Sequence, residues 1–108
     1  MAKHILRATS KTWDEVVINA KGLVLVEFWA MWCSPCRELV SMIKEITEEY
    51  ADKLTVVKVD KEECQDIADK YNVMGVPTFI FFKDSERIGR IVGIITKEEL
   101  IKNIKAYM

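Results

Sequence analysis

Two cysteines separated by two residues, Cys33 and Cys36, constrain this chain more than any other feature. They follow an almost entirely apolar run over residues 23–30, which is typical of a strand buried on both faces, and they precede a segment with helical periodicity. A C-x-x-C pair at the junction of a strand and a helix is typical of a redox dithiol, because two sulfurs on one turn can close a disulfide. We therefore predict a reactive dithiol at this junction.

The two cysteines differ in their expected surroundings. Cys36 lies on the apolar stripe of the predicted helix, whereas Cys33 precedes its first full turn and lies off that stripe. A helix N-terminus favours a thiolate, so we predict that Cys33 is an exposed attacking thiolate and Cys36 a buried resolving thiol. The alternative is half of a zinc site, which would need two more ligands. The only other candidates of that type, Cys64 and His4, lie outside any paired motif.

The hydrophobic periodicity predicts alternating strands and helices. Strands are expected at residues 4–7, 23–30, 54–59, 78–82 and 88–92, with the last two forming an antiparallel hairpin. Helices are expected from about residue 12 to Gly22, from the cysteine motif to residue 50, over 62–71, and after Thr96. Thr12-x-x-Glu15 and Thr96-x-x-Glu99 have the spacing of capping boxes. The order βαβαβαββα predicts an α/β fold, with a mixed sheet covered by helices on both faces.

Composition limits the class of protein. The 108 residues suit one domain spanning residues 1–108, and the 50% hydrophobic content is enough for a core. Charged residues of both signs sum to a net charge of −1, which argues against a nucleic-acid partner. No apolar stretch approaches the ~20 residues that span a membrane, and the N-terminus shows no signal-peptide pattern. Three cysteines are too few for a disulfide framework, so we expect a cytoplasmic protein.

Several segments together resemble the thioredoxin family, in order and spacing, from about Leu6 to Tyr107. They are the strand 26–30 with the motif 32–36, the segments 58–60 and 75–79, and the pair 92–93. The resemblance implies the thioredoxin fold with a central five-stranded sheet, and a protein-disulfide reductase in which Cys33 attacks and Cys36 resolves. It also implies protein disulfides as substrates, a thioredoxin reductase as electron donor, a monomer, and no cofactor besides the Cys33–Cys36 disulfide. The alternative is a thioredoxin-fold binding subunit whose redox chemistry is secondary.

Two charged residues interrupt strands that should be buried, Glu27 and Lys58. Each would cost several kcal/mol if it were buried alone and charged, but in neighbouring strands the two could approach each other. The resemblance implies that Glu27 exchanges a proton with Cys36, since the family carries a buried carboxylate, usually aspartate, behind its resolving cysteine. The extra methylene of glutamate leaves direct or water-mediated transfer open. A structural ion pair is the alternative. We expect burial to raise the pKa of Glu27.

The resemblance also implies a substrate-contact surface that comprises Trp32, Ser34, Pro35, Val76, Pro77, Val92 and Gly93. Pro77 should follow a cis peptide bond and leave the backbone of Val76 available to an extended substrate segment. Met31 and Met74 border this surface by sequence position and could contact substrates or fill the core.

Three further residues mark questions that the sequence poses. Ser34 replaces the glycine that is usual between the family's cysteines, and Ser41 stands where many members have a helix-kinking proline. The helix after the motif should therefore be straighter, or bent by a serine hydroxyl that bonds a carbonyl. Cys64 lies on an apolar stripe, which predicts a buried core residue rather than a regulatory thiol.

Overall fold

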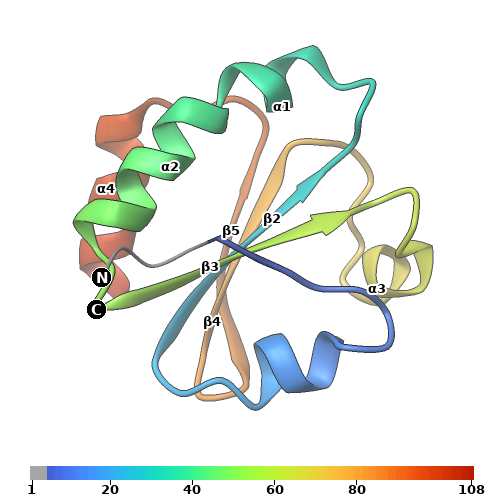
Figure 1. The fold of residues 1–108 in the computed structure, drawn as a ribbon, viewed down its shortest axis with the longest axis horizontal. Coiled ribbons are helices and arrows are strands. Elements are labelled where there is room, and N and C mark those ends of the chain that lie inside the picture. Colours follow the sequence, from blue (N-terminus) through green and yellow to red (C-terminus); the bar gives the residue numbers. More distant parts are fainter. Residues whose placement is uncertain (1–4) are drawn as a thin grey trace.

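A five-stranded sheet runs through the centre of the computed structural model, which describes residues 5–108 (Figure 1). Its strands are β1 (Leu6–Arg7), β2 (Leu23–Trp29), β3 (Leu54–Asp60), β4 (Thr78–Lys83) and β5 (Glu86–Val92), in the spatial order β1-β3-β2-β4-β5. β3 pairs in parallel with β1 and β2, while β4 pairs antiparallel with β2 and β5. The predicted mixed sheet and its terminal hairpin are confirmed, and the prediction for His4 lies outside the described residues.

Helices cover both faces of the sheet, as predicted (Figure 1). They are the one-turn π-helix η1 (Asp14–Ile18), α1 (Ser34–Glu38), α2 (Val40–Glu49), α3 (Gln65–Lys70) and α4 (Lys97–Tyr107). Side chains of η1 and α3 share one buried cluster, which includes Trp13, Val17, Ile67 and Ala68. Side chains of α2 and α4 share the other, which includes Ile43, Ile46, Leu100 and Ile104.

Strand β2 separates these two clusters, because successive side chains of a strand point to opposite faces. Val24, Val26 and Phe28 join the cluster beneath η1 and α3. Leu23 and Leu25 join the cluster beneath α2 and α4. The same alternation directs the Glu27 side chain to the face of Leu23 and Leu25, which α2 covers.

The single long helix predicted after the motif is wrong, because it is broken at Leu39. The Leu39 N–H bonds to the Cys36 carbonyl, three residues back, at 3.2 Å, and α2 then begins afresh with the Ile43 N–H on the Leu39 carbonyl at 2.9 Å. This tight turn changes the helix phase, so Val40 is exposed rather than on the buried stripe. The helix therefore changes course without a proline, one turn after the cysteine motif.

The first predicted capping box is wrong and the second is confirmed. The Thr12 hydroxyl accepts the N–H of Thr9 at 2.9 Å and leaves η1 without a side-chain cap, so that helix is shorter than predicted. The Thr96 hydroxyl accepts the N–H of Glu99 at 3.1 Å and caps α4. Helix α3 begins only after Cys64, which is buried as predicted.

The last turn of α4 packs against the hairpin. The rings of Tyr107 and Phe81 lie 4.8 Å apart, and Tyr107 also covers Gly89 on β5. A Cβ at position 89 would overlap the Tyr107 ring in its present place, so a larger residue there would require the ring to move.

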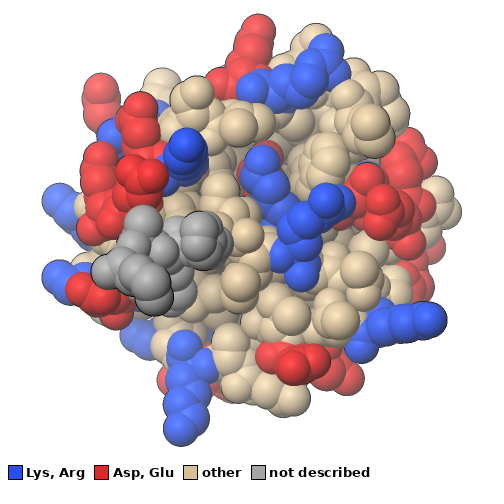
Figure 2. Space-filling view, in the orientation of Figure 1, with Lys and Arg blue, Asp and Glu red and all other residues tan. Residues whose placement is uncertain are grey.

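Within residues 5–108, no helix is both long and apolar enough to span a membrane. On the face shown in Figure 2, Lys and Arg side chains are interspersed with Asp and Glu, and acidic groups gather over α2 and over α3. This face therefore carries no continuous basic field.

Candidate active site

The two motif cysteines form a disulfide at the junction of β2 and α1, with their Cα atoms 5.3 Å apart. Cys33 is the N-cap residue of α1, and its sulfur accepts the backbone N–H of Cys36 at 3.2 Å. Pro35 occupies the first turn, where a residue without an N–H costs no helical hydrogen bond. An N–H directed at the Cys33 sulfur favours negative charge on that atom.

The predicted contrast in exposure is wrong for this disulfide form, because Cys33 and Cys36 are each only 4% exposed. Ala30, Trp29 and Val76 pack around the pair and cover both sulfurs. The N–H bond to the Cys33 sulfur, rather than access to solvent, is what distinguishes the two cysteines here.

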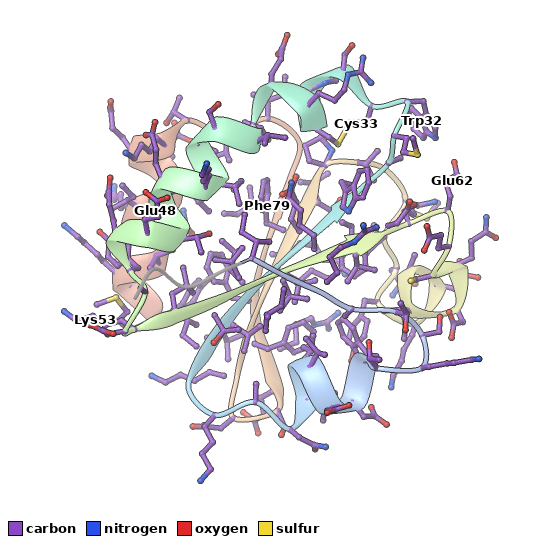
Figure 3. The ribbon with its side chains drawn as sticks, in the orientation of Figure 1. Trp32, Cys33, Glu48, Lys53, Glu62 and Phe79 are labelled. Atoms are coloured by element: carbon purple, nitrogen blue, oxygen red, sulfur yellow. A yellow bond between two sulfur atoms is a disulfide. The ribbon has the colours of Figure 1, made fainter. Side chains whose placement is uncertain are left out.

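The exposed large apolar side chains include Met31 and Trp32, which directly precede Cys33 in the sequence, and Met74. Trp32 is 66% exposed, and its indole N–H donates to Glu62 at 2.7 Å (Figure 3). Met31 is exposed and Met74 is 91% exposed, so neither fills the core. Exposed apolar side chains of this size on several loops mark a surface that can contact another protein.

The predicted substrate-contact residues lie in three segments, residues 32–35, 76–77 and 92–93, and the first of these contains Cys33. Val76 packs against the cysteine pair, and the Val76–Pro77 peptide bond is cis. The Gly93 N–H donates to the Pro77 carbonyl at 2.9 Å and joins the second segment to the third. Val92 is exposed beside Gly93, and Ser34 is exposed between the cysteines.

Glu27 and Lys58 are direct neighbours in the β2–β3 register. The Lys58 Nζ lies 3.9 Å from a Glu27 carboxyl oxygen, with the Glu27 side chain 1% and the Lys58 side chain 18% exposed. Neither carboxyl oxygen of Glu27 has a hydrogen-bond partner among the described residues. Burial raises the pKa of the Glu27 carboxyl from 4.5 to about 7, although the charge of Lys58 opposes this rise. The expected direction of the pKa change is confirmed.

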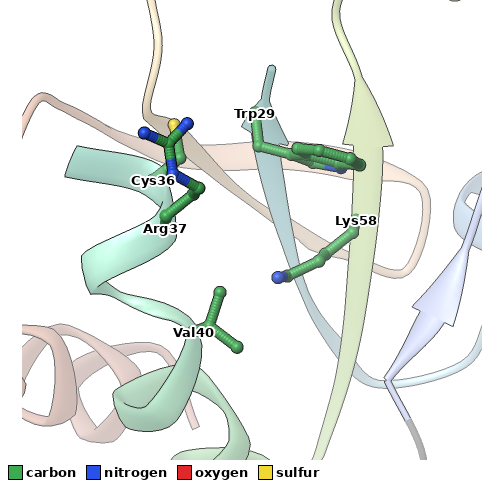
Figure 4. A pocket seen from close by; sticks show the side chains of 5 residues that line it. All are labelled: Trp29, Cys36, Arg37, Val40 and Lys58. Carbon is green, nitrogen blue, oxygen red and sulfur yellow. The ribbon is translucent and has the colours of Figure 1, made fainter. Parts of the chain in front are cut away.

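A cavity of about 240 Å³ lies between Cys36 and Lys58. Trp29, Arg37 and Val40 complete its lining, and Lys58 reaches from β3 toward the helix side of the cavity (Figure 4). Glu27 makes no direct hydrogen bond to Cys36. Glu27 does not line this cavity, but its partner Lys58 does, so Cys36 and the Lys58–Glu27 pair border the same space.

Among the described residues, Cys64 does not join the motif cysteines in a possible zinc site. Cys33 and Cys36 are joined to each other, Cys64 is buried beside the Ala8 carbonyl, and His4 lies outside the described residues. Residues 5–108 hold no group of three His, Cys, Asp or Glu side chains that could bind a metal ion. Burial raises the pKa of the Cys64 thiol, which makes it a poor nucleophile.

Two functional contacts were missed by sequence reasoning. Arg37 donates from one guanidinium nitrogen to the Met31 carbonyl and from the other to the Ser34 hydroxyl. Glu62 fixes the indole of Trp32. Charged residues beside a motif are a weak signal, because their reach depends on loop geometry that periodicity does not predict.

This sheet order, with a C-x-x-C disulfide at the start of the helix that follows a central strand, defines a thioredoxin-fold protein with a redox-active cysteine pair. The family model described as Thioredoxin matches residues 4–106, and the chain belongs to the thioredoxin family.

Known relatives cover the chain almost completely. It is 38% identical to "Thioredoxin C-2" of Corynebacterium nephridii and to "Thioredoxin" of Pseudomonas aeruginosa, each over 93% of both chains. It is 39% identical to "Thioredoxin M-type, chloroplastic" of Pisum sativum over 90% of its own length. The chain spans 56–60% of the length of the chloroplastic relatives from pea, wheat and spinach.

Proposed function

We propose that this protein is a thiol–disulfide oxidoreductase that reduces disulfides in other proteins. The observation that carries the proposal is the Cys33–Cys36 pair, in which the Cys33 sulfur receives an N–H, set among exposed apolar side chains. Membership of the thioredoxin family supports the same activity.

In the first step, the Cys33 thiolate attacks one sulfur of a substrate disulfide. The Cys33–substrate bond forms as the substrate S–S bond breaks, and the departing sulfur leaves as a thiolate that takes up a proton. The Cys36 N–H stabilises the Cys33 thiolate before the attack. Val76, Pro77, Val92 and Gly93, with Trp32, Ser34 and Pro35, contact the substrate segment around its disulfide.

In the second step, Cys36 passes its proton toward the Glu27 carboxylate through the cavity that it lines, and its sulfur then attacks Cys33. The Cys33–Cys36 disulfide forms, and the second substrate sulfur leaves as a thiolate. Two electrons have moved from the dithiol to the substrate. A pKa of about 7 suits Glu27 to take and return a proton near neutral pH. Lys58 supports this role, because its charge keeps the buried carboxyl ionisable.

The remaining parts of the proposal concern the whole protein. We expect residues 1–108 to act as one monomeric domain in the cytoplasm, with a thioredoxin reductase restoring the dithiol. The continuous sheet supports one domain, and the similarity to bacterial thioredoxins over 93% of both chains supports this carrier role. No cofactor is needed, because the cysteine pair itself carries the two electrons.

Trapping of substrates tests the assigned cysteine roles. Cys36→Ser should accumulate stable mixed disulfides with a disulfide-bonded protein such as insulin, because the resolving thiol is missing. Cys33→Ser should trap almost nothing, since Cys36 is not the attacking group. The adducts can be counted on non-reducing gels and located by mass spectrometry.

The wild-type protein and a Cys64→Ser variant serve as controls, and both should reduce insulin with turnover. Equal trapping by the two motif variants would overturn the roles of Cys33 and Cys36. A wild-type protein that reduces no protein disulfide would favour the alternative of a binding subunit.

A further inference from the structure

The turn that precedes α1 is held to that helix by the side chain of Arg37. One guanidinium nitrogen donates to the Met31 carbonyl at 2.7 Å, and the other donates to the Ser34 hydroxyl oxygen at 3.1 Å. We call these two hydrogen bonds the Arg37 clasp. The residues held by the clasp flank Trp32 and Cys33, so it encloses the attacking cysteine and the exposed tryptophan.

The clasp depends on the shape of arginine. A guanidinium is a planar group whose donors can reach two acceptors at once, whereas a lysine ammonium is a single point of charge on a flexible stem. Its second bond depends on Ser34, because the glycine that is usual at this position has no side-chain oxygen. The serine between the cysteines therefore supplies one of the two anchoring points.

The clasp should matter more after reduction than before it. In the present structure the turn is also tied by the Cys33–Cys36 disulfide, by the Cys33 N–H on the Ala30 carbonyl at 3.1 Å, and by the Trp32–Glu62 hydrogen bond. Reduction removes the covalent tie and leaves the hydrogen bonds. An exposed turn with few remaining ties opens easily, because local opening costs little where few buried contacts resist it.

We infer that Arg37, acting with Ser34, is a positioning residue that keeps the turn of the reduced protein in the geometry it has in the oxidised protein. Cys33 and Trp32 are then already in place when a protein substrate binds. This inference rests on the proposed reductase function for its kinetic consequence, but its structural consequence is independent. Preorganising a binding loop improves capture by lowering the ordering cost of association.

Amide hydrogen exchange in both redox states tests the structural part. In Arg37→Ala, exchange of the Cys33 amide, which donates to the Ala30 carbonyl, should accelerate about threefold to tenfold in the reduced protein, as expected for lost charge-assisted hydrogen bonds. In the oxidised protein the change should stay under about twofold, because the disulfide still holds the turn. Arg37→Lys and Ser34→Ala should each give an intermediate acceleration, and Arg87→Ala, on β5, is the matched arginine control.

Kinetics test the functional part with two substrates. For insulin, Arg37→Ala should raise KM about threefold to tenfold, and this change should clearly exceed any change in the rate with a small aromatic disulfide. In the exchange experiment, the Ser34→Ala/Arg37→Ala variant should accelerate exchange no more than Arg37→Ala does, because both substitutions break the same clasp.

Equal exchange effects in both redox states, or full rescue of exchange and KM by lysine, would overturn the inference. An equal loss with both substrates would do the same, because it would indicate an effect on the Cys33 thiolate. If the wild-type protein reduces no protein disulfide, the proposed function fails, and the exchange experiment still decides whether the clasp acts.

Discussion

Glutamate meets lysine in two regions of this protein, and the two arrangements are opposites. On the surface, Lys97 at the start of α4 donates to Glu45 and Glu49 of α2, each at 2.8 Å. In the interior, Lys58 approaches Glu27 only to 3.9 Å, and both carboxyl oxygens of Glu27 lack a hydrogen bond among the described residues. The short contacts of Lys97 lie at the surface, where ion pairs contribute little to stability. The long contact of Lys58 lies in the interior, where an ionised carboxylate lowers stability.

The difference separates a structural contact from a chemical one. Hydrogen bonds to Glu45 and then to Glu49 raise the pKa of Lys97, so that group stays charged and joins two helices. Burial holds the pKa of Glu27 at about 7, so that group can change its protonation state near neutral pH. Under the proposed function, Glu27 is therefore the group that exchanges a proton with Cys36.

The largest expected effect is on the pH dependence of stability. The folded-state pKa of Glu27 lies above its ordinary value of 4.5, so this group favours folding below pH 4.5, and the advantage is lost as pH rises through about 7. The loss amounts to about 3 kcal/mol between pH 4.5 and 8. In the oxidised protein, Glu27→Gln should lack this dependence, so the stability difference between variant and wild type should shift by about 2–3 kcal/mol between pH 5 and 8.

Denaturant unfolding at the two pH values measures this shift. Glu27→Ala is the companion variant, and it should be only slightly more stable than wild type at pH 8, because the smaller side chain leaves a cavity. A stability difference that is the same at both pH values would show that Glu27 does not titrate on folding.

The next effect is on the rate of resolution. Glu27→Gln keeps the size of the side chain and removes the proton acceptor, so release of substrate from the mixed disulfide should slow about tenfold at pH 7. The defect should shrink as pH rises, because solvent then takes the Cys36 proton. Single-turnover reduction followed by quenched-flow alkylation measures the step, with Glu45→Gln as control. A wild-type rate in Glu27→Gln would make Glu27 a structural partner of Lys58.

The smallest effect belongs to the surface pairs. Lys97→Ala should lower Tm by about 1–3 °C at low salt and by less at high salt, and it should leave disulfide reduction unchanged. Calorimetry at two ionic strengths measures it. A large loss of activity would contradict the division between structural and chemical pairs.

The sheet and the place of its buried charge were predictable for one physical reason. Near-continuous apolar residues over 23–30 require burial on both faces, so Glu27 had to be enclosed wherever the strand lay. The raised pKa of Glu27 follows from that enclosure. Its lack of a hydrogen-bond partner among residues 5–108 did not follow, because it depends on the 3.9 Å distance to Lys58, which only packing determines.

The predictions that failed concern local competition between hydrogen bonds. The break at Leu39 comes from one tight turn that no glycine or proline marks, and the Thr12 hydroxyl bonds Thr9 rather than the helix. In the Arg37 clasp, Arg37 bonds the Met31 carbonyl six residues earlier, across a turn. Hydrophobic periodicity does not predict the shape of that turn. In the disulfide form, the cluster that contains Cys33 also packs against Val76, which is distant in sequence.

The contact between Tyr107 and Gly89 bears on how this sequence can vary. No side chain fits at position 89 while the Tyr107 ring keeps its present place, so a substitution at position 89 also moves position 107. A larger residue at position 89 would turn the Tyr107 ring away, and Phe81 would then lose part of its cover. Designers who attach a tag or fuse a second domain should therefore keep Tyr107 in its helix, because it closes one end of the core.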